Sequence, residues 1–278
     1  MYLRPNTLAE AVETLSLANA QILAGGTDVY PSLGDRPLTG TIVDISALKE
    51  LRGISEDGKY FHIGALTTWT DLIRTPLPRC FDGLKAAARE IGGIQIQNSG
   101  TIAGNLCNAS PAADSVPPLL TLDAEVELTS QAGTRRLKLA DFITGNRKTL
   151  RQPGEILSQV LIPRTAEDAN SVFLKLGARR YLVISIAMVA AVLQKDSAGR
   201  VAQARISVGS CSAVAARLPE LEHQLLGAEM SAGLGSRATA AHLKNVSPIT
   251  DARATAPYRQ EAALQLVQRA LNACAETA

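Results

Sequence analysis

Residues 96–114 read IQNSGTIAGNLCNASPAAD, and 75 residues before the glycines of this run, residues 24–28 read AGGTD. Glycines allow backbone N–H groups to approach a ligand where a Cβ atom would block contact, and such groups of amides bind phosphate oxygens. Each run follows a plausible strand and ends in side chains suited to ribose or phosphate contact: Asp28, Asn105 and Asp114. The two runs together predict one diphosphate held between two loops.

Each of these residues also has a purely structural interpretation. Gly25 and Gly26 are compatible with a strand end, and Gly100, Gly104 and Asn105 with an ordinary turn. Thr27 and Asp28 suit the start of a helix, and Asp114 suits the cap of a short helix before the two prolines that follow it. The G-x-G-x-x-G and G-x-x-x-x-G-K-[ST] patterns are absent, which disfavours the Rossmann and P-loop classes.

The segments around the first run predict a small α/β layer. A helix is expected after Thr7, which has capping-box spacing to Glu10. Short strands are expected at 21–24 and 41–45, so that the first glycine turn lies at a strand's carboxyl end.

The rest of the chain predicts an α+β arrangement. Asp57-Gly58 marks a hairpin, and the polar stretch 164–170 marks a domain boundary. The remaining helices are expected at 83–91, 139–142, 213–226 and 258–275, and the remaining strands at 125–129, 135–139, 155–163, 172–176, 184–194 and 201–209. In the last helix Leu264, Val267, Leu271 and Cys274 form one apolar stripe.

Composition excludes several classes of function. The 278 residues carry 28 Lys+Arg and 26 Asp+Glu with only 4 % aromatics, so nucleic acid is a poor candidate partner. No secretory segment and no run of about 18 apolar residues is seen, which predicts a cytoplasmic protein without a membrane span. The four cysteines lack C-x-x-C spacing and the three histidines lack ligand spacing, so we expect reduced thiols, no iron–sulfur cluster and no metal in this chain.

Residues 96–114 closely resemble the flavin-binding signature of the molybdenum hydroxylase family, which includes xanthine dehydrogenases, carbon monoxide dehydrogenase and bacterial N-heterocycle hydroxylases. The resemblance continues through KLGARR at 175–180 and TAPYR at 255–259, in the order of the separate FAD-carrying medium subunit. It implies a two-subdomain FAD-binding module of the PCMH/vanillyl-alcohol-oxidase type over 1–167, with subdomains at about 1–55 and 56–167. A small domain with a three-stranded antiparallel sheet and helices would follow over 168–278.

The resemblance also implies which residues contact a non-covalent FAD. The two glycine runs would hold the diphosphate, Asp114 the ribityl or ribose hydroxyls, and Leu157 the adenine end. Lys175 would lie near the flavin ring and Tyr181 would shield it, although Lys175 is equally compatible with a solvated strand lysine. The complete set of predicted cofactor contacts is Leu23, Ala24, Gly25, Gly26, Thr27, Asp28, Val29, Gly100, Thr101, Ala103, Gly104, Asn105, Asp114, Leu157, Lys175 and Tyr181.

The resemblance further implies a division of labour among chains. A large subunit with a molybdenum–pterin cofactor would hydroxylate an N-heterocycle or aldehyde, and a small subunit with [2Fe–2S] clusters would pass electrons to this chain, in a heterotrimer or its dimer. No catalytic acid, base or nucleophile is then expected here. Eukaryotic-type xanthine dehydrogenases that reduce NAD carry acidic residues just after a matching arginine pair. Here the pair at 179–180 is followed by Tyr-Leu-Val-Ile, which contains no carboxylate. This difference from the family pattern disfavours NAD as the final electron acceptor and leaves oxygen, quinone or another acceptor open.

Two alternatives remain at the level of sequence. One is a self-sufficient FAD-dependent oxidoreductase, which would need its own substrate pocket with an acid–base residue. The other is a scaffold subunit that has lost FAD. The intact glycines and Asp114 argue against the second alternative.

Overall fold

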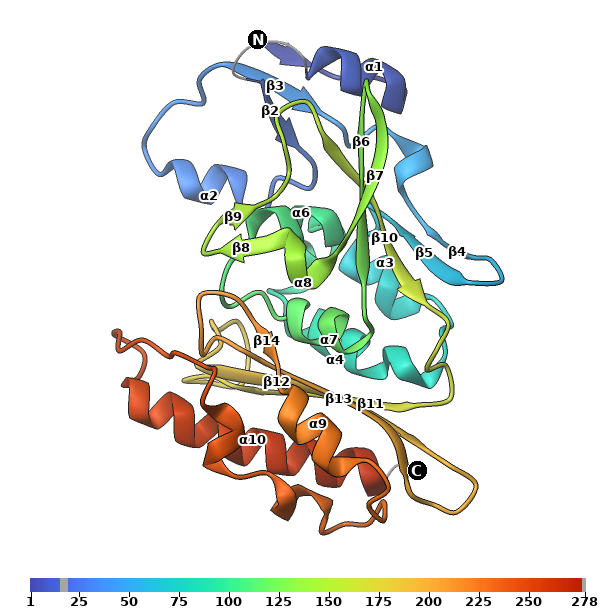
Figure 1. Ribbon diagram of the computed structural model, residues 1–278. Coiled ribbons are helices and arrows are strands. Elements are labelled where there is room, and N and C mark those ends of the chain that lie inside the picture. The colour runs from blue at the N-terminus through green and yellow to red at the C-terminus, as the bar shows by residue number, and fades with distance from the viewer. Residues whose placement is uncertain (16–19, 277–278) are drawn as a thin grey trace. The chain divides into compact units, whose positions relative to one another are not determined.

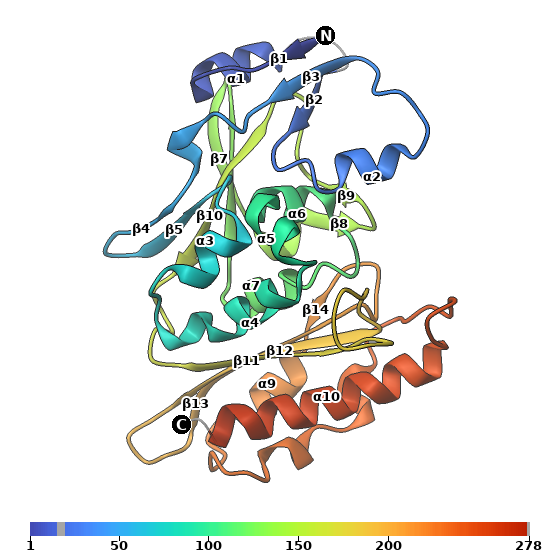
Figure 2. The ribbon, with the colours of Figure 1, turned by 180° about the vertical axis from the view of Figure 1, so that it is seen from behind.

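The computed structural model of the protein describes residues 1–15 and 20–276, which form two compact units. One unit comprises Met1–Thr75, Gly93–Ala109 and Ala124–Ile162, and the other comprises Pro76–Gly92, Ser110–Asp123 and Pro163–Ala278. Figures 1 and 2 show the elements of each unit from opposite sides. Because the segments alternate, each unit is built from parts that are distant in sequence.

The first unit begins with a small parallel sheet in the order β1 (Tyr2–Leu3), β3 (Thr41–Asp44), β2 (Ala20–Leu23). Helix α1 (Leu8–Thr14) starts at the predicted N-cap, where the hydroxyl of Thr7 accepts a hydrogen bond from the amide of Glu10. Strand β2 leads directly into the first glycine run, which is followed by the short helix α2 (Val29–Leu33). The first run therefore lies at the carboxyl end of a strand, as predicted.

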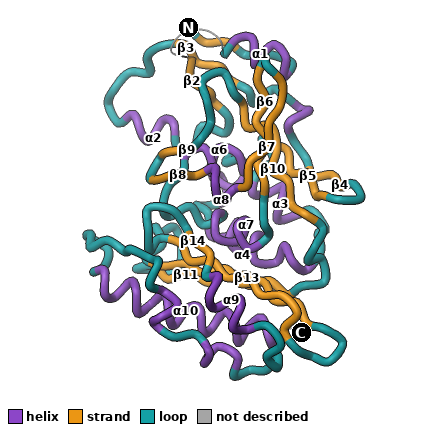
Figure 3. Tube along the Cα trace, in the orientation of Figure 1, coloured by secondary structure: helices purple, strands orange, loops and turns teal. Residues whose placement is uncertain are grey.

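A five-stranded sheet is the largest sheet of the first unit, with the long β6–β7 hairpin prominent in Figure 3. Asp57-Gly58 connects two antiparallel strands, which confirms the predicted hairpin. The central β10 is buried along nearly its whole length, because both of its sides carry neighbouring strands and its side chains pack into the core. The strands in sheet order are β4 (Ile54–Glu56), β5 (Tyr60–Gly64), β10 (Ile156–Pro163), β6 (Glu125–Ser130) and β7 (Gly133–Lys138).

Short helices and one small hairpin complete this unit. Trp69, at the start of α3, is almost fully buried, and a capping box between Thr68 and Asp71 fixes that helix start. The elements are η1 (Lys49–Leu51), α3 (Trp69–Arg74), α5 (Ile94–Ser99), α6 (Ile102–Asn108), α8 (Leu139–Phe142), β8 (Ile143–Gly145) and β9 (Lys148–Thr149).

The second unit is a four-stranded antiparallel sheet with helices on both faces (Figure 1). Its order is β11 (Asn170–Leu176), β12 (Ala187–Lys195), β13 (Val201–Gly209), β14 (Ala216–Arg217). Helices α9 (Pro219–Leu225) and α10 (Ala256–Glu276) cover one face, and α4 (Asp82–Glu90) and α7 (Val116–Thr121) the other. Coverage on both faces explains why β12 is an almost unbroken apolar run. The unit also contains η2 (Arg79–Phe81), η3 (Leu234–Arg237) and η4 (Ala240–Leu243).

The sequence prediction for this sheet needs one correction. Three strands were expected, and β14 is a fourth that lies where the sequence predicted the first half of a helix. Pairing of Ala216 and Arg217 with β13 holds this segment extended, and the helix begins only at Pro219, whose ring suits a first helical position. Cys274 is fully buried in the core, as the apolar stripe predicted.

A buried arginine connects the start of α10 to this sheet by hydrogen bonds. Arg259 is 3 % exposed and donates to the carbonyl oxygens of Ile186 at 2.6 Å and Ser210 at 3.3 Å. Its guanidinium also lies 2.7 Å from a carboxylate oxygen of Asp251, so the buried charge has a partner. No helix in the described part of the chain is both long enough and apolar enough to cross a membrane.

Candidate functional site

The first glycine run exposes unused hydrogen-bond donors. Among residues 1–15 and 20–276, the amide N–H groups of Gly25, Gly26 and Thr27 have no protein acceptor. Gly26 has a positive φ of 70°, a conformation that side chains with a Cβ atom rarely adopt. A polar loop with three unpaired amides at the end of a buried strand is suited to bind anionic oxygens.

The two glycine runs touch each other, and Gly25 makes this possible. A Cβ atom at Gly25 would lie 1.8 Å from the carbonyl oxygen of Ser99. The absence of a side chain at Gly25 therefore serves the close approach of two backbone segments, in addition to any approach of a ligand. This contact confirms that residues 75 positions apart come together, as the sequence predicted.

The second run differs from the first in its donors. The four amides of the first turn of α6 all have protein acceptors: Ile102 N–H with Thr67 O, Ala103 N–H with Ala65 O, Gly104 N–H with Thr101 Oγ1, and Asn105 N–H with Thr101 O. The sequence predicted a group of free amides in this run as well, but these four amides are all occupied by protein acceptors. The second run instead contains Thr101, the N-cap residue of α6, and Gly104, an exposed residue at which no side chain would block a ligand.

A polar bridge links the first run to a hairpin of the same unit. Asp28 occupies the N-cap position of α2, but its side chain makes no capping hydrogen bond. Its carboxylate instead accepts a hydrogen bond from the Asn108 amide, whose oxygen accepts one from the Arg147 guanidinium. The backbone N–H of Arg147 donates to the carbonyl of Ala109 at 2.9 Å. Asn108 and Arg147 were not singled out from sequence, and no pattern in it connects them to Asp28.

In the second unit, Lys175 and Asp114 form a buried ion pair. The ammonium nitrogen lies 2.6 Å from a carboxylate oxygen, and Ser185 Oγ donates to the other oxygen at 2.5 Å. Both charged side chains are only 7 % exposed, so the solvated-strand interpretation of Lys175 is wrong. Burial raises the pKa of Asp114 above its ordinary value, against the opposing effect of Lys175 and of the hydrogen bonds.

The remaining predicted residues differ in their surroundings. Leu157 is buried in β10, next to Glu155, whose carboxylate pairs with Arg135 at 2.6 Å. Tyr181 is 61 % exposed, and the Arg180 guanidinium lies 5.2 Å from the centre of its ring. Leu23, Thr101 and Ala103 are buried, whereas Ala24, Val29 and Asn105 are half-buried.

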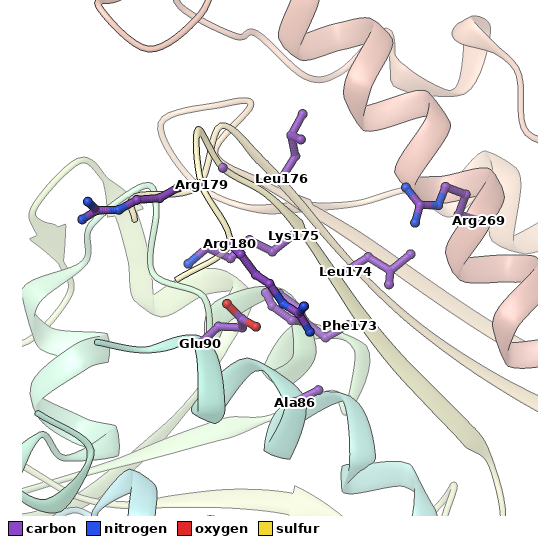
Figure 4. Close-up of a pocket in the computed structure, with 10 residues that line it drawn as sticks. Ala86, Glu90, Phe173, Leu174, Lys175, Leu176, Arg179, Arg180 and Arg269 are labelled. Carbon is purple, nitrogen blue, oxygen red and sulfur yellow. The ribbon is translucent and has the colours of Figure 1, made fainter. Parts of the chain in front are cut away.

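A pocket of about 600 Å³ lies in the second unit along β11 (Figure 4). Glu90 of α4 borders it on one side of the strand and Arg269 of α10 on the other. Among the residues that the structure describes, no group of three or more His, Cys, Asp and Glu side chains is arranged to hold a metal ion.

Two family models match this chain. The FAD binding domain in molybdopterin dehydrogenase matches residues 1–165, which is more than half of the sequence. The chain belongs to the family of FAD-binding subunits of the molybdenum hydroxylases. The CO dehydrogenase flavoprotein C-terminal domain matches residues 172–274 and accounts for most of the remainder.

Individual relatives agree with this family. The chain is 36 % identical over 238 residues to the nicotinate dehydrogenase FAD-subunit of Eubacterium barkeri, covering 83 % of this chain and 80 % of that one. It is 36 % identical over 275 residues to a putative xanthine dehydrogenase FAD-binding subunit of Escherichia coli (strain K12), covering 96 % and 91 %. A solved structure of reconstituted CO dehydrogenase from Oligotropha carboxidovorans superposes with a TM-score of 0.91 at 29 % identity, over 100 % of this chain and 98 % of that chain.

Family membership confirms several predictions made from sequence. The resemblance, the α+β fold class, FAD as the cofactor and the oxidoreductase class are all confirmed. The flavoprotein subunit role is confirmed as well, and it disfavours both the self-sufficient flavoenzyme and the FAD-free scaffold. The individual contact residues and the domain bounds stay predictions.

Proposed function

We propose that this subunit binds FAD without a covalent bond and relays electrons from the [2Fe–2S] clusters of a small partner subunit to a final acceptor. The organic substrate, an N-heterocycle or an aldehyde, would be hydroxylated on a large molybdenum–pterin subunit. Bound FAD supplies the redox chemistry, because it can take up single electrons and deliver a pair. The protein's own residues bind and orient it.

The observation that carries this proposal is the set of three unpaired amides at Gly25, Gly26 and Thr27. The donors that a diphosphate needs are present on one loop, and the contact of Gly25 with Ser99 fixes the position of that loop. Gly104 is exposed and lacks a side chain, so it allows close approach of a ligand on the second run. These features fit the diphosphate of FAD.

Other residues of the predicted contact set receive roles that their surroundings support. We assign Asp28 to ribose hydroxyls, with the Asn108 amide donating to its carboxylate. Asp114 and Lys175 are assigned to the ribityl and ring region, as a pair whose charges are already matched. We keep Leu157 and Tyr181 as contacts of the adenine end and the ring. We also keep the domain division 1–167 and 168–278.

The assembly we propose is a heterotrimer, or a dimer of heterotrimers, in the cytoplasm. The segment after β11 supports a partner surface, since Tyr181, Leu182 and Ile184 are 61, 58 and 51 % exposed. Large apolar side chains gathered in one exposed segment are typical of an interaction surface.

Spectroscopy of the purified chain tests the cofactor. We expect a yellow protein that releases FAD on denaturation. All four thiols have pKa values raised by burial, to about 12 for Cys80 and Cys274 and about 11 for Cys107 and Cys211, so none is a thiolate near neutral pH that could bond to the flavin. Protein that stays colourless after incubation with FAD would contradict the proposal, and so would flavin that remains attached after denaturation.

Purification from the native source tests the assembly. Co-purifying chains that carry molybdenum and iron–sulfur clusters are expected. Recovery of this chain alone, with turnover of an organic substrate, would instead support a self-sufficient flavoenzyme.

A further inference from the structure

Strand β11 is an edge of its sheet, and its second half borders a pocket. It pairs with β12 on one side and with no other strand in the described part of the chain. Near its start the strand lies against α4, since the Gly83 amide donates to Ser171 Oγ at 3.1 Å and a Cβ at Gly83 would lie 3.2 Å from the Val172 backbone. Residues 173–177 instead border the pocket of about 600 Å³. An edge strand presents unpaired N–H and C=O groups there.

The pocket, called the slot below, lies along this open edge. Figure 4 shows Ala86 and Glu90 of α4 on one side of β11 and Arg269 of α10 on the other. Phe173 and Leu174 contribute apolar surface from opposite faces of the strand. The slot thus offers backbone donors and acceptors together with alternating apolar contacts, as a site for an added strand requires.

The charge of the slot is positive. Arg180 and Arg269 are exposed and have no carboxylate partner among the described residues, and Arg179 donates only to the carbonyl of Leu182. The Lys175 charge is matched by Asp114, so Glu90 is the single carboxylate that lines the slot. The unmatched guanidinium groups favour a ligand that carries carboxylates.

We propose that an extended, acidic segment of a partner subunit adds to the open edge of β11 as a further strand, with its carboxylates on Arg180 and Arg269. A peptide satisfies both features of the slot, whereas a small anion would use the arginines and leave the strand edge unpaired. About five residues of an extended segment would match 173–177 at roughly 3.3 Å per residue. This inference rests on the proposed assembly with partner subunits.

Hydrogen exchange tests the strand addition directly. The FAD-loaded subunit alone is compared with the complex co-purified from the native source. Those amides of residues 173–177 that point away from β12, every second one along the strand, should exchange at least about tenfold more slowly in the complex, because they gain hydrogen bonds. Unchanged exchange at 173–177 in an intact complex would overturn this inference alone. Failure to recover any partner would overturn the proposed assembly and the inference with it.

Charge reversal tests the acidic character of the segment. Arg180→Glu/Arg269→Glu is compared with Lys195→Glu/Arg237→Glu, which changes the same charge at exposed positions outside the slot. We expect the slot variant to raise the Kd for reassembly at least tenfold over the control, while both variants keep the FAD content and unfolding temperature of the unaltered chain. Equal reassembly of the two variants would overturn the proposal, since a neutral or basic segment would not distinguish them.

Discussion

Lys175 Nζ lies 2.6 Å from Asp114 Oδ2 in the second unit, although the two residues are 61 positions apart. Both side chains are almost fully buried, and Ser185 occupies the other carboxylate oxygen. A buried pair of this kind is costly to break because one charge is left without a partner, whereas replacing both members can be nearly neutral.

At a pH at which Asp114 is ionised, Lys175→Met should therefore destabilise the protein by about 3–5 kcal/mol, the usual cost of leaving a buried charge unpaired. The double variant Lys175→Met/Asp114→Asn should recover most of this loss, because no charge remains. Denaturant unfolding of the single and double variants measures both values. A double variant no more stable than Lys175→Met would show that the pair is not the source of the effect.

The pH dependence of stability should report Asp114. Burial raises the pKa of Asp114 in the folded protein, so the folded state binds this proton more tightly than the unfolded chain. The resulting contribution to stability is complete below the ordinary carboxyl pKa and is lost as the pH rises through the folded value. The unfolding free energy of the unaltered chain relative to Asp114→Asn should accordingly fall as the pH rises above about 4, the ordinary carboxyl value, over the range in which the chain stays folded. A difference that is constant over this range would contradict the raised pKa.

Gly25→Ala should separate the two glycine runs. Its Cβ would be 1.8 Å from the Ser99 carbonyl oxygen, and backbone must move to relieve this clash. We expect lower thermal stability and at least tenfold weaker FAD binding, measured by flavin fluorescence. Gly58→Ala is the matched control in the same unit, since nothing lies within 4 Å of its Cβ position. Similar FAD affinities for the two variants would exclude the loop contact as a determinant of binding.

Gly104→Ala distinguishes ligand approach from helix capping. Its Cβ would lie 2.8 Å from Thr101 Oγ1, the hydroxyl that caps α6, so some stability will be lost with the cap, on the order of 1 kcal/mol. Thr101→Val removes the same cap without placing a methyl group at Gly104. FAD affinity should fall further in Gly104→Ala than in Thr101→Val. If both variants lose the same affinity, loss of the Thr101 hydroxyl, as helix cap or as predicted FAD contact, accounts for the effect.

Asn108→Leu should weaken FAD binding through Asp28. It removes the bridge between the Asp28 carboxylate and the Arg147 guanidinium, a loss of about 1–3 kcal/mol for hydrogen bonds to charged groups. Titration with FAD measures the change. Asn98→Leu serves as control, because Asn98 accepts a hydrogen bond from Thr70 at 2.6 Å on an exposed helix and has no bond to the first run. Equal affinities would mean that Asp28 does not depend on this bridge.

Local patterns in the sequence predicted the local structure well. The Thr7 cap and the Asp57-Gly58 hairpin formed as expected, because their determinants lie within three or four residues of each other. The extended conformation of Ala216 and Arg217 was missed, because pairing with β13 outweighs the local preference for helix.

The candidate site was predictable only in its outline. The glycine runs could be recognised, and their contact could be inferred from the family signature. Two of the four amides in the first turn of α6 donate to the carbonyls of residues 65 and 67, and no spacing in the sequence connects these residues to that helix. No spacing in the sequence connects Lys175 to Asp114 either. The two residues meet because three separate segments fold into one unit.

The alternation of segments between the units bears on how the protein can be divided for study. The C-terminal stretch that starts after residue 167 contains β11 and β12 but lacks α4 and α7, which cover one face of their sheet. Phe173, Met188 and Ala190, which pack against Ala87 of α4, would then face water. A gene fragment cut at the apparent domain boundary would therefore encode an aggregation-prone polypeptide. A soluble version of this unit would need residues 76–92 and 110–123 as well, linked to the C-terminal stretch by newly designed loops.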